Sequence, residues 1–226
     1  SIKWMGFATT VSPARGDNFT LTPAAAGPSA ATQPALAVHV TQNNAGIDID
    51  TGGAQGIQCH ITPDTANLFD TLVIAGHTVA VDAHLEMILQ HGPDADPTTA
   101  APPPAREHFT SLVKSVTVEQ AGPVRAVVKF QGMYKADDGP RQFLPFTVRL
   151  YFYAGQTPVR MVHTFFYDGN EHEDFIRGMG ITASVPFREE IQNRHVRFAG
   201  AGNGLWAEPI EPALGYQGGV RYPNGG

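Results

Sequence analysis

Two segments with an apolar residue at every second position do most to limit the folds that this chain can adopt. In residues 124–130 (VRAVVKF) and 146–152 (FTVRLYF), every even-numbered residue is apolar. A period of two is that of a β-strand with one buried face. The chain also contains 24 Gly and 18 Pro, a composition that favours short strands joined by turns over helices. We therefore predict an all-β fold, an antiparallel sandwich or barrel with long loops and little helix.

The same pattern gives an order of strands. The β pattern resumes strongly at Phe109 after a proline-rich break, and predicted strands cover residues 2–11, 36–40, 46–50, 55–61, 69–74, 78–85, 123–131, 145–153, 159–167 and 174–185. Residues 12–35 and 91–105 are rich in Pro and Ala and are predicted to be long loops. We expect residues 1–226 to form one β-rich domain. Because the chain opens in a strand and closes on a turn-rich tail, we expect it to be a fragment of a larger polypeptide.

Charge and composition exclude several functions. The net charge is −6, so a nucleic-acid partner, which requires a basic footprint, is not expected. Residues 110–197 carry a balance of +2 and the remainder −8, so an anionic ligand is better received by the second half. No apolar stretch is long enough for a membrane span. Cys59 is the single cysteine and is expected to be a buried, inert thiol. No motif for a cofactor or a metal ion is present, and neither is expected.

One predicted sheet surface carries cations and tyrosines together. Pairing of neighbouring strands would bring six residues onto one face: Arg125, Lys129, Arg149, Tyr151, Tyr153 and Arg160. Guanidinium groups bind carboxylates and aromatic rings stack on sugar rings, so this face suits a carboxylated sugar. A solvent-exposed sheet face, which is common in antiparallel sheets, and an interface covered by another domain or subunit are the alternatives for these residue types.

Three further features attract attention. His163 lies in phase with apolar neighbours and is expected to face the core. The loop 167–174 (YDGNEHED) lacks the spacing of a calcium loop and is predicted to be an Asp-Gly hairpin turn. Near the end of the chain, Arg194, His195 and Arg197 could bind a carboxylate or form a solvated turn. The sequon at Asn18 predicts glycosylation, and with it an extracellular, secreted protein.

Four longer motifs carry a resemblance to a known family. They are SIKWMGFATT, GPVRAVVKFQGMY, the segment from LPFTVRLYFY to FIRGMGI, and NRHVRFAGAGNGLWAE, spread from Ser1 to about Glu208. Together they resemble the N-terminal β region of exo-rhamnogalacturonan lyases (polysaccharide lyase family 26) and their YetA-like relatives. The resemblance implies a RIFT-barrel-like domain that precedes a helical toroid.

The resemblance also implies a function. It implies β-elimination on a uronate-containing polysaccharide such as rhamnogalacturonan, with the acidic polysaccharide or a covering (α/α) toroid domain or subunit as partner. It assigns no catalytic residue in this segment, which by itself is not expected to suffice for activity. The alternative is a non-catalytic, secreted carbohydrate-binding or structural module that reuses the fold.

Overall fold

The computed structural model describes residues 36–63, 65–94, 98, 102–199 and 204–209. The predicted strand 2–11, the loop 12–35 and the sequon at Asn18 lie outside these residues. The chain divides into two compact units, Ser1–Ser184 and Val185–Gly226.

The described part of the larger unit is a set of strands that all pair antiparallel with their neighbours. Their bounds are β1 His39–Asn43, β2 Gly46–Asp50, β3 Ile57–Ile61, β4 Asn67–Ile74, β5 His77–His91, β6 Arg106–Ala121, β7 Arg125–Ala136, β8 Gln142–Tyr153, β9 Arg160–Phe165 and β10 Asp174–Ser184. The strands follow the sequence-based prediction closely from β2 onward. The main differences are that β5, β7 and β8 are longer than predicted and that β1 begins three residues later.

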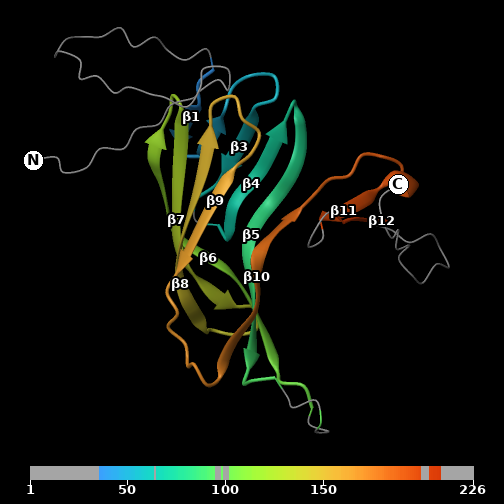
Figure 1. Ribbon diagram of the computed structural model, residues 1–226. Coiled ribbons are helices and arrows are strands. Elements are labelled where there is room, and N and C mark those ends of the chain that lie inside the picture. Colours follow the sequence, from blue (N-terminus) through green and yellow to red (C-terminus); the bar gives the residue numbers. More distant parts are fainter. Residues whose placement is uncertain (1–35, 64, 95–97, 99–101, 200–203, 210–226) are drawn as a thin grey trace, which may run out of the picture. The chain divides into compact units, whose positions relative to one another are not determined.

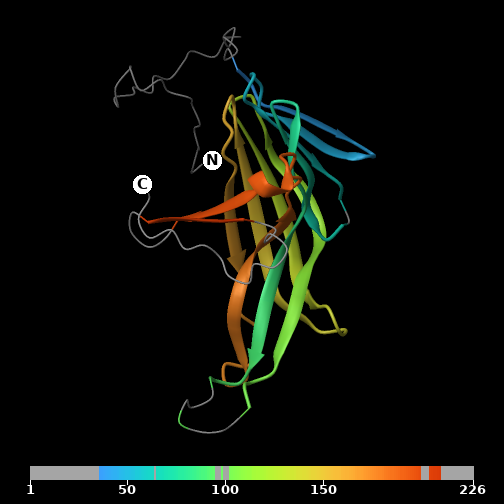
Figure 2. The same cartoon turned by 90° about the vertical axis from the view of Figure 1, so that its right-hand side faces the viewer.

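Strand β5 joins two layers of sheet. Neighbouring strands pair in the order β1 to β9, and β10 pairs with β5. β5 pairs with β4 through residues 77–84, with β6 through residues 86–90, and with β10 through residues 81–91. The sheet folds over at β5, so that β1–β5 with β10 form one layer and β6–β9 the other (Figures 1 and 2). Because β9 pairs with β8 and β10 with β5, the sheet stays open between β9 and β10. The fold is a sandwich and not a closed barrel.

One apolar core fills the space between the layers. The even-numbered residues of β8 from Leu144 to Phe152 are buried, and those from Phe146 onward, including Val148 and Leu150, follow the predicted alternation. Opposite them lie apolar residues of β2, β3 and β5, such as Ile49 and Leu85. The burial of apolar side chains from both layers is the main force that holds the sandwich together. Cys59 belongs to this core, and its burial raises the pKa of the thiol far above the ordinary value, as expected for an inert cysteine.

The segment 166–173 is not the hairpin turn that the sequence predicted. β9 pairs with β8 and β10 with β5, so this segment crosses from one layer to the other. Asp168 accepts a hydrogen bond from the backbone N–H of Leu144 at 2.9 Å, and Asp174 forms an ion pair with Arg141 at 2.8 Å. Partial burial would raise the pKa of Asp174, but hydrogen bonds from Arg141 and the N–H of Asn170 lower it. The carboxylates of this segment therefore anchor a crossover, which the local Asp-Gly signal could not distinguish from a hairpin.

The opposite end of the sandwich is tied by backbone contacts. The N–H of Gly155 donates to the carbonyl of Thr51 at 2.6 Å, and the N–H of Val38 donates to the carbonyl of Pro123 at 2.7 Å. Gly122 lies at φ +88°, and a Cβ there would collide with the carbonyl oxygen of Val38. Glycine at this position therefore permits both the turn and the close approach of β1 to the β6–β7 connection.

The described part of the smaller unit is a two-stranded antiparallel sheet of β11 (His195–Ala199) and β12 (Leu205–Pro209), preceded by the short 3-10 helix η2 (Ile191–Asn193). Within the described ranges, no helix has the length and apolar character needed to cross a membrane.

Candidate functional site

The cationic face is the outer surface of the β6–β9 layer, and it gathers the six residues that the alternation placed together. They are Arg125, Lys129, Arg149, Tyr151, Tyr153 and Arg160. Partners across antiparallel strands point to the same side of a sheet. The register pairs Arg125 with Tyr153 and Lys129 with Arg149 across β7 and β8, and Tyr151 with Arg160 across β8 and β9. Their placement on one face, opposite the buried even-numbered residues of β8, is confirmed.

Tyr151 lies at the centre of the cationic face between two guanidinium groups. The Cζ atom of Arg125 is 5.7 Å from the centroid of the Tyr151 ring, and that of Arg160 is 5.5 Å away. Both distances fall within the range of cation–π interactions. Beside this ring, Val127 is buried although it belongs to the outer face. Both arginines contact the same ring, and among the described residues neither forms an ion pair with a carboxylate.

A residue that the sequence analysis missed occupies the other half of the face. Glu119 is the extra residue of a β-bulge between Val118 and Gln120. Its carboxylate accepts two hydrogen bonds from Arg149, at 2.7 and 3.0 Å, and lies 3.6 Å from Lys129. The hydrogen bond from Arg149 lowers the pKa of Glu119, and the same contact raises that of Arg149. An extra residue in a strand breaks the period of two, so alternation alone could not place Glu119 on this face.

The cationic face is equipped to bind rather than to transfer protons. Four cations face one carboxylate, which leaves an excess of positive charge near Arg125 and Arg160. Neither Arg149, with its raised pKa, nor Glu119, with its lowered pKa, is suited to proton transfer near neutral pH. Arg149 is already engaged with Glu119, and Nε of Arg125 donates a hydrogen bond to Oε1 of Gln120 at 2.7 Å. The guanidinium of Arg160 and the other N–H groups of Arg125 are therefore the ones available to a carboxylate ligand.

His163 lies on the inner side of the same layer, as its phase predicted. Its ring contacts Tyr134 and Phe146, with ring centroids 6.1 and 6.0 Å away. Burial lowers the pKa of His163, and its Nε2 atom has no hydrogen-bond partner among the described residues. The hydroxyl of Tyr134 is likewise buried without a described partner. Neither group reaches the cationic face, because His163 pairs with the inward-facing Val148.

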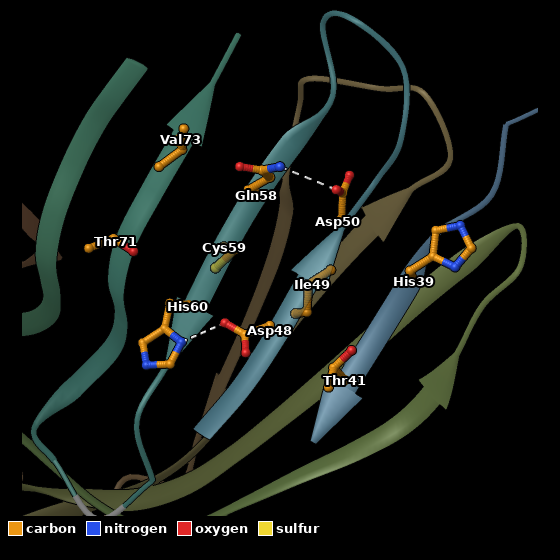
Figure 3. A pocket seen from close by; sticks show the side chains of 10 residues that line it. All are labelled: His39, Thr41, Asp48, Ile49, Asp50, Gln58, Cys59, His60, Thr71 and Val73. Carbon is orange, nitrogen blue, oxygen red and sulfur yellow. Dashed lines mark hydrogen bonds and ion pairs between the residues drawn. The ribbon is translucent and has the colours of Figure 1, made fainter. Parts of the chain in front are cut away.

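A second candidate site, which the sequence analysis did not identify, lies on the outer surface of the other layer. We call it the acidic hollow (Figure 3), a depression of about 340 Å³ lined by His39, Thr41, Asp48, Ile49, Asp50, Gln58, Cys59, His60, Thr71 and Val73. The register of β1–β4 arranges its outward side chains in two rows. One row is His39, Asp50, Gln58 and Val73, and the other is Thr41, Asp48, His60 and Thr71.

Hydrogen bonds link the two rows of the acidic hollow to fixed partners. The Nδ1 atom of His60 lies 2.7 Å from Oδ1 of Asp48. Asp50 accepts a hydrogen bond from the N–H of Gly52 at 2.7 Å and one from the side-chain amide of Gln58 at 3.3 Å. Four separate strands must meet in register to form these rows, so no short motif in the sequence signals them.

The remaining predicted site residues lie in the smaller unit. Arg194 donates a hydrogen bond from Nε to the carbonyl of Glu189 at 2.7 Å, and Nδ1 of His195 lies 3.0 Å from the carbonyl of Asn193. His195 and Arg197 are both exposed on β11. The contacts of Arg194 and His195 are local backbone contacts, and a carboxylate-binding role for the three residues stays a prediction.

Comparison with known proteins gives two matches. A family model described as "PcRGLX-like protein central beta sandwich domain" matches residues 38–221. "Uncharacterized protein YetA" of Bacillus subtilis (strain 168) is 30% identical over 211 residues, which cover 93% of this chain and 23% of YetA. The chain thus spans about a quarter of the length of that curated relative. The family resemblance is confirmed, and the description of a central β-sandwich agrees with the open sandwich, in place of the N-terminal, barrel-like domain that the resemblance had led us to expect.

Proposed function

Because this chain belongs to the PcRGLX-like family, which is rhamnogalacturonan-lyase-like, we propose that it is the central β-sandwich part of a protein that cleaves uronate-containing polysaccharide by β-elimination. In this proposal the domain binds the polymer at the cationic face. The polymer is rhamnogalacturonan or a closely related acidic polysaccharide. The protein acts outside the cell, as the sequon at Asn18 suggests.

The observation that carries the proposal is the pair of guanidinium groups on either side of Tyr151. Arg125 and Arg160 are each within 6 Å of the ring centroid, and neither shares the carboxylate of Glu119. A uronate residue offers a carboxylate to the arginines and a sugar ring to the tyrosine. Stacking on an aromatic ring and charge-assisted hydrogen bonds can therefore act on the same sugar residue.

The chemistry of β-elimination needs a base for the proton next to the carboxylate and an acid for the leaving oxygen. The described residues of the cationic face offer arginines, a lysine, tyrosines and a carboxylate of lowered pKa. We therefore assign binding to this domain and place proton transfer in other parts of the complete protein, such as a toroid domain that covers this face.

Two measurements test the proposed activity and binding, and a third tests the placement outside the cell. The complete protein, incubated with rhamnogalacturonan, should release products with the absorbance of unsaturated uronates, and no absorbance with any pectic or algal uronate would remove the lyase assignment. The 226-residue chain should bind oligosaccharides of rhamnogalacturonan in calorimetry without cleaving them. Intact mass spectrometry of the native protein would show a glycan at Asn18, and an unmodified Asn18 would count against extracellular placement.

The cationic face also favours a second candidate, a non-catalytic carbohydrate-binding module, because the contacts of Arg125, Tyr151 and Arg160 account for binding by themselves. The same two measurements separate the candidates. Binding by the chain together with a lyase-inactive complete protein would support the module.

A further inference from the structure

We propose that the acidic hollow is a binding site for a neutral, hydroxyl-rich ligand, namely a sugar residue that carries no carboxylate. The site lies on the outer surface of β1–β4, in the layer opposite the cationic face (Figures 1 and 3). The inference goes beyond the proposed function, because it does not depend on β-elimination or on uronate binding.

Two of the polar side chains of the acidic hollow, Asp48 and Asp50, are hydrogen-bond acceptors only, whereas Thr41, Thr71 and Gln58 can donate as well as accept. An ionised carboxylate only accepts, so the 2.7 Å contact with Asp48 requires the proton of a neutral His60 to sit on Nδ1. The Nε2 atom of His60 is then an acceptor as well, with the hydroxyl of Thr62 at 3.5 Å. Asp50 has lone pairs beyond those used by Gly52 and Gln58, because a carboxylate has about four acceptor sites. A ligand that fits these atoms must bring several donors.

Hydroxyl groups supply such donors without a charge of their own. The rows are two residues apart along each strand, so Asp48 and Asp50 present acceptors about 7 Å apart on one surface. Thr71 and Val73 on β4 add methyl groups at one edge, against which the C–H groups of a sugar ring can pack. The volume of about 340 Å³ lies at the lower end of the range for small-ligand sites.

Charge distinguishes this ligand from a uronate. The lining contains two aspartates and no lysine or arginine. A carboxylated sugar would place a third negative charge beside Asp48 and Asp50, which like-charge repulsion disfavours. Cations are also attracted by acceptors, and a metal ion is one of them. However, the described residues contain no group of three or more His, Cys, Asp or Glu side chains placed to hold one.

The test is an NMR titration of the 226-residue chain. The probes are rhamnose, galactose and arabinose as neutral sugars, galacturonate as the acidic sugar, and CaCl₂ and ZnCl₂ as cations. We expect at least one neutral sugar to produce saturable shifts of the backbone amides of Gln58, Cys59 and Val73. Galacturonate should leave these amides unshifted.

Matched variants locate the site. Asp48→Asn and His60→Phe each remove a polar contact and should weaken binding of the neutral sugar at least about tenfold. Glu86→Gln removes an exposed carboxylate outside the hollow and should leave binding unchanged. Because Asp48 is exposed, Asp48→Asn should not disturb the core.

Three results would overturn the proposal. They are saturable shifts with galacturonate of equal or greater affinity, shifts produced by calcium or zinc alone, and no saturable shift with any of the three neutral sugars. Because the probes for the cationic face are acidic oligosaccharides, failure here leaves the proposed function standing, and the reverse also holds.

Discussion

The two outer faces of the sandwich share one construction and differ in charge. Each is the solvent side of four antiparallel strands whose inner side belongs to the common core. On β6–β9 the outward positions hold arginines, a lysine and tyrosines, whereas on β1–β4 they hold aspartates, histidines and threonines. The core therefore determines the fold through the inward-facing residues of each strand. The opposite face of each strand is free to carry different chemistry on the two layers.

Removal of the two arginines beside Tyr151 should have the largest effect on the binding of acidic ligands by the cationic face. We expect Arg125→Ala combined with Arg160→Ala to weaken binding of acidic oligosaccharides at least about 100-fold, because each charge-assisted hydrogen bond contributes about 1.5–3 kcal/mol. Calorimetry measures the change. Arg177→Ala is the matched control, since Arg177 is an exposed arginine on β10 that pairs with Asp94. An equal loss in the control would mean that net charge alone governs binding.

Substitution of Tyr151, whose ring contacts both arginines, should reduce ligand affinity by a smaller factor. Tyr151→Ala removes the stacking surface and the cation–π contacts, and we expect about tenfold weaker binding of acidic oligosaccharides in the same calorimetric assay. Tyr151→Phe keeps the ring and should remain within about twofold of the parent chain. If the phenylalanine variant loses as much affinity as the alanine variant, the hydroxyl of Tyr151 and not its ring contacts the ligand.

Glu119 offers a change in the opposite direction. Glu119→Gln frees Arg149 and Lys129 from their shared carboxylate, so the cationic face should bind acidic oligosaccharides a few-fold more tightly. The gain should shrink as salt is added, because exposed charges are screened. Binding titrations at low and high NaCl concentration measure both effects. Weaker binding by this variant would show that Glu119 itself contacts the ligand.

The smallest expected effect concerns the inner side, where His163 contrasts with the solvent-facing His60. Burial lowers the pKa of His163 in the folded state, so protonation favours the unfolded chain. Stability should therefore fall as the pH drops from 7 through the ordinary histidine pKa of about 6.5 toward the lower folded value. His163→Phe should flatten this part of the profile, as measured by urea unfolding at pH 7 and pH 5. An unchanged profile would mean that His163 is not protonated in this range in either state.

Alternation was sufficient to predict β7 and β8 and the shared face of Arg125, Arg149 and Tyr151, but not β11 and β12. Both depend on a local period of two and on pairing between strands that follow each other in the chain. The crossover at 166–173 could not be predicted, because the partner of β10 is β5, far away in sequence. Local turn residues say how the chain bends and not which strand it reaches.

Glu119 and the acidic hollow were both missed by the sequence analysis for the same kind of reason. Glu119 is displaced by a bulge, which shifts the phase of β6 relative to β7. The acidic hollow draws on four strands, and each contributes only two outward residues, which resemble an ordinary solvent-exposed surface. Such sites become visible only when the register across several strands is known.

The branch point at β5 has a consequence for how the larger unit comes apart. Since β5 holds β4 and β6 in succession along one edge and β10 along the other, neither layer can detach without rupturing its ladder. Damage to either layer should therefore lower one shared melting temperature. The slowest amide hydrogen exchange of the larger unit should lie in the part of β5 that is flanked on both edges, residues 81–90. The two outer faces can thus differ in chemistry, although the larger unit unfolds as a single cooperative unit.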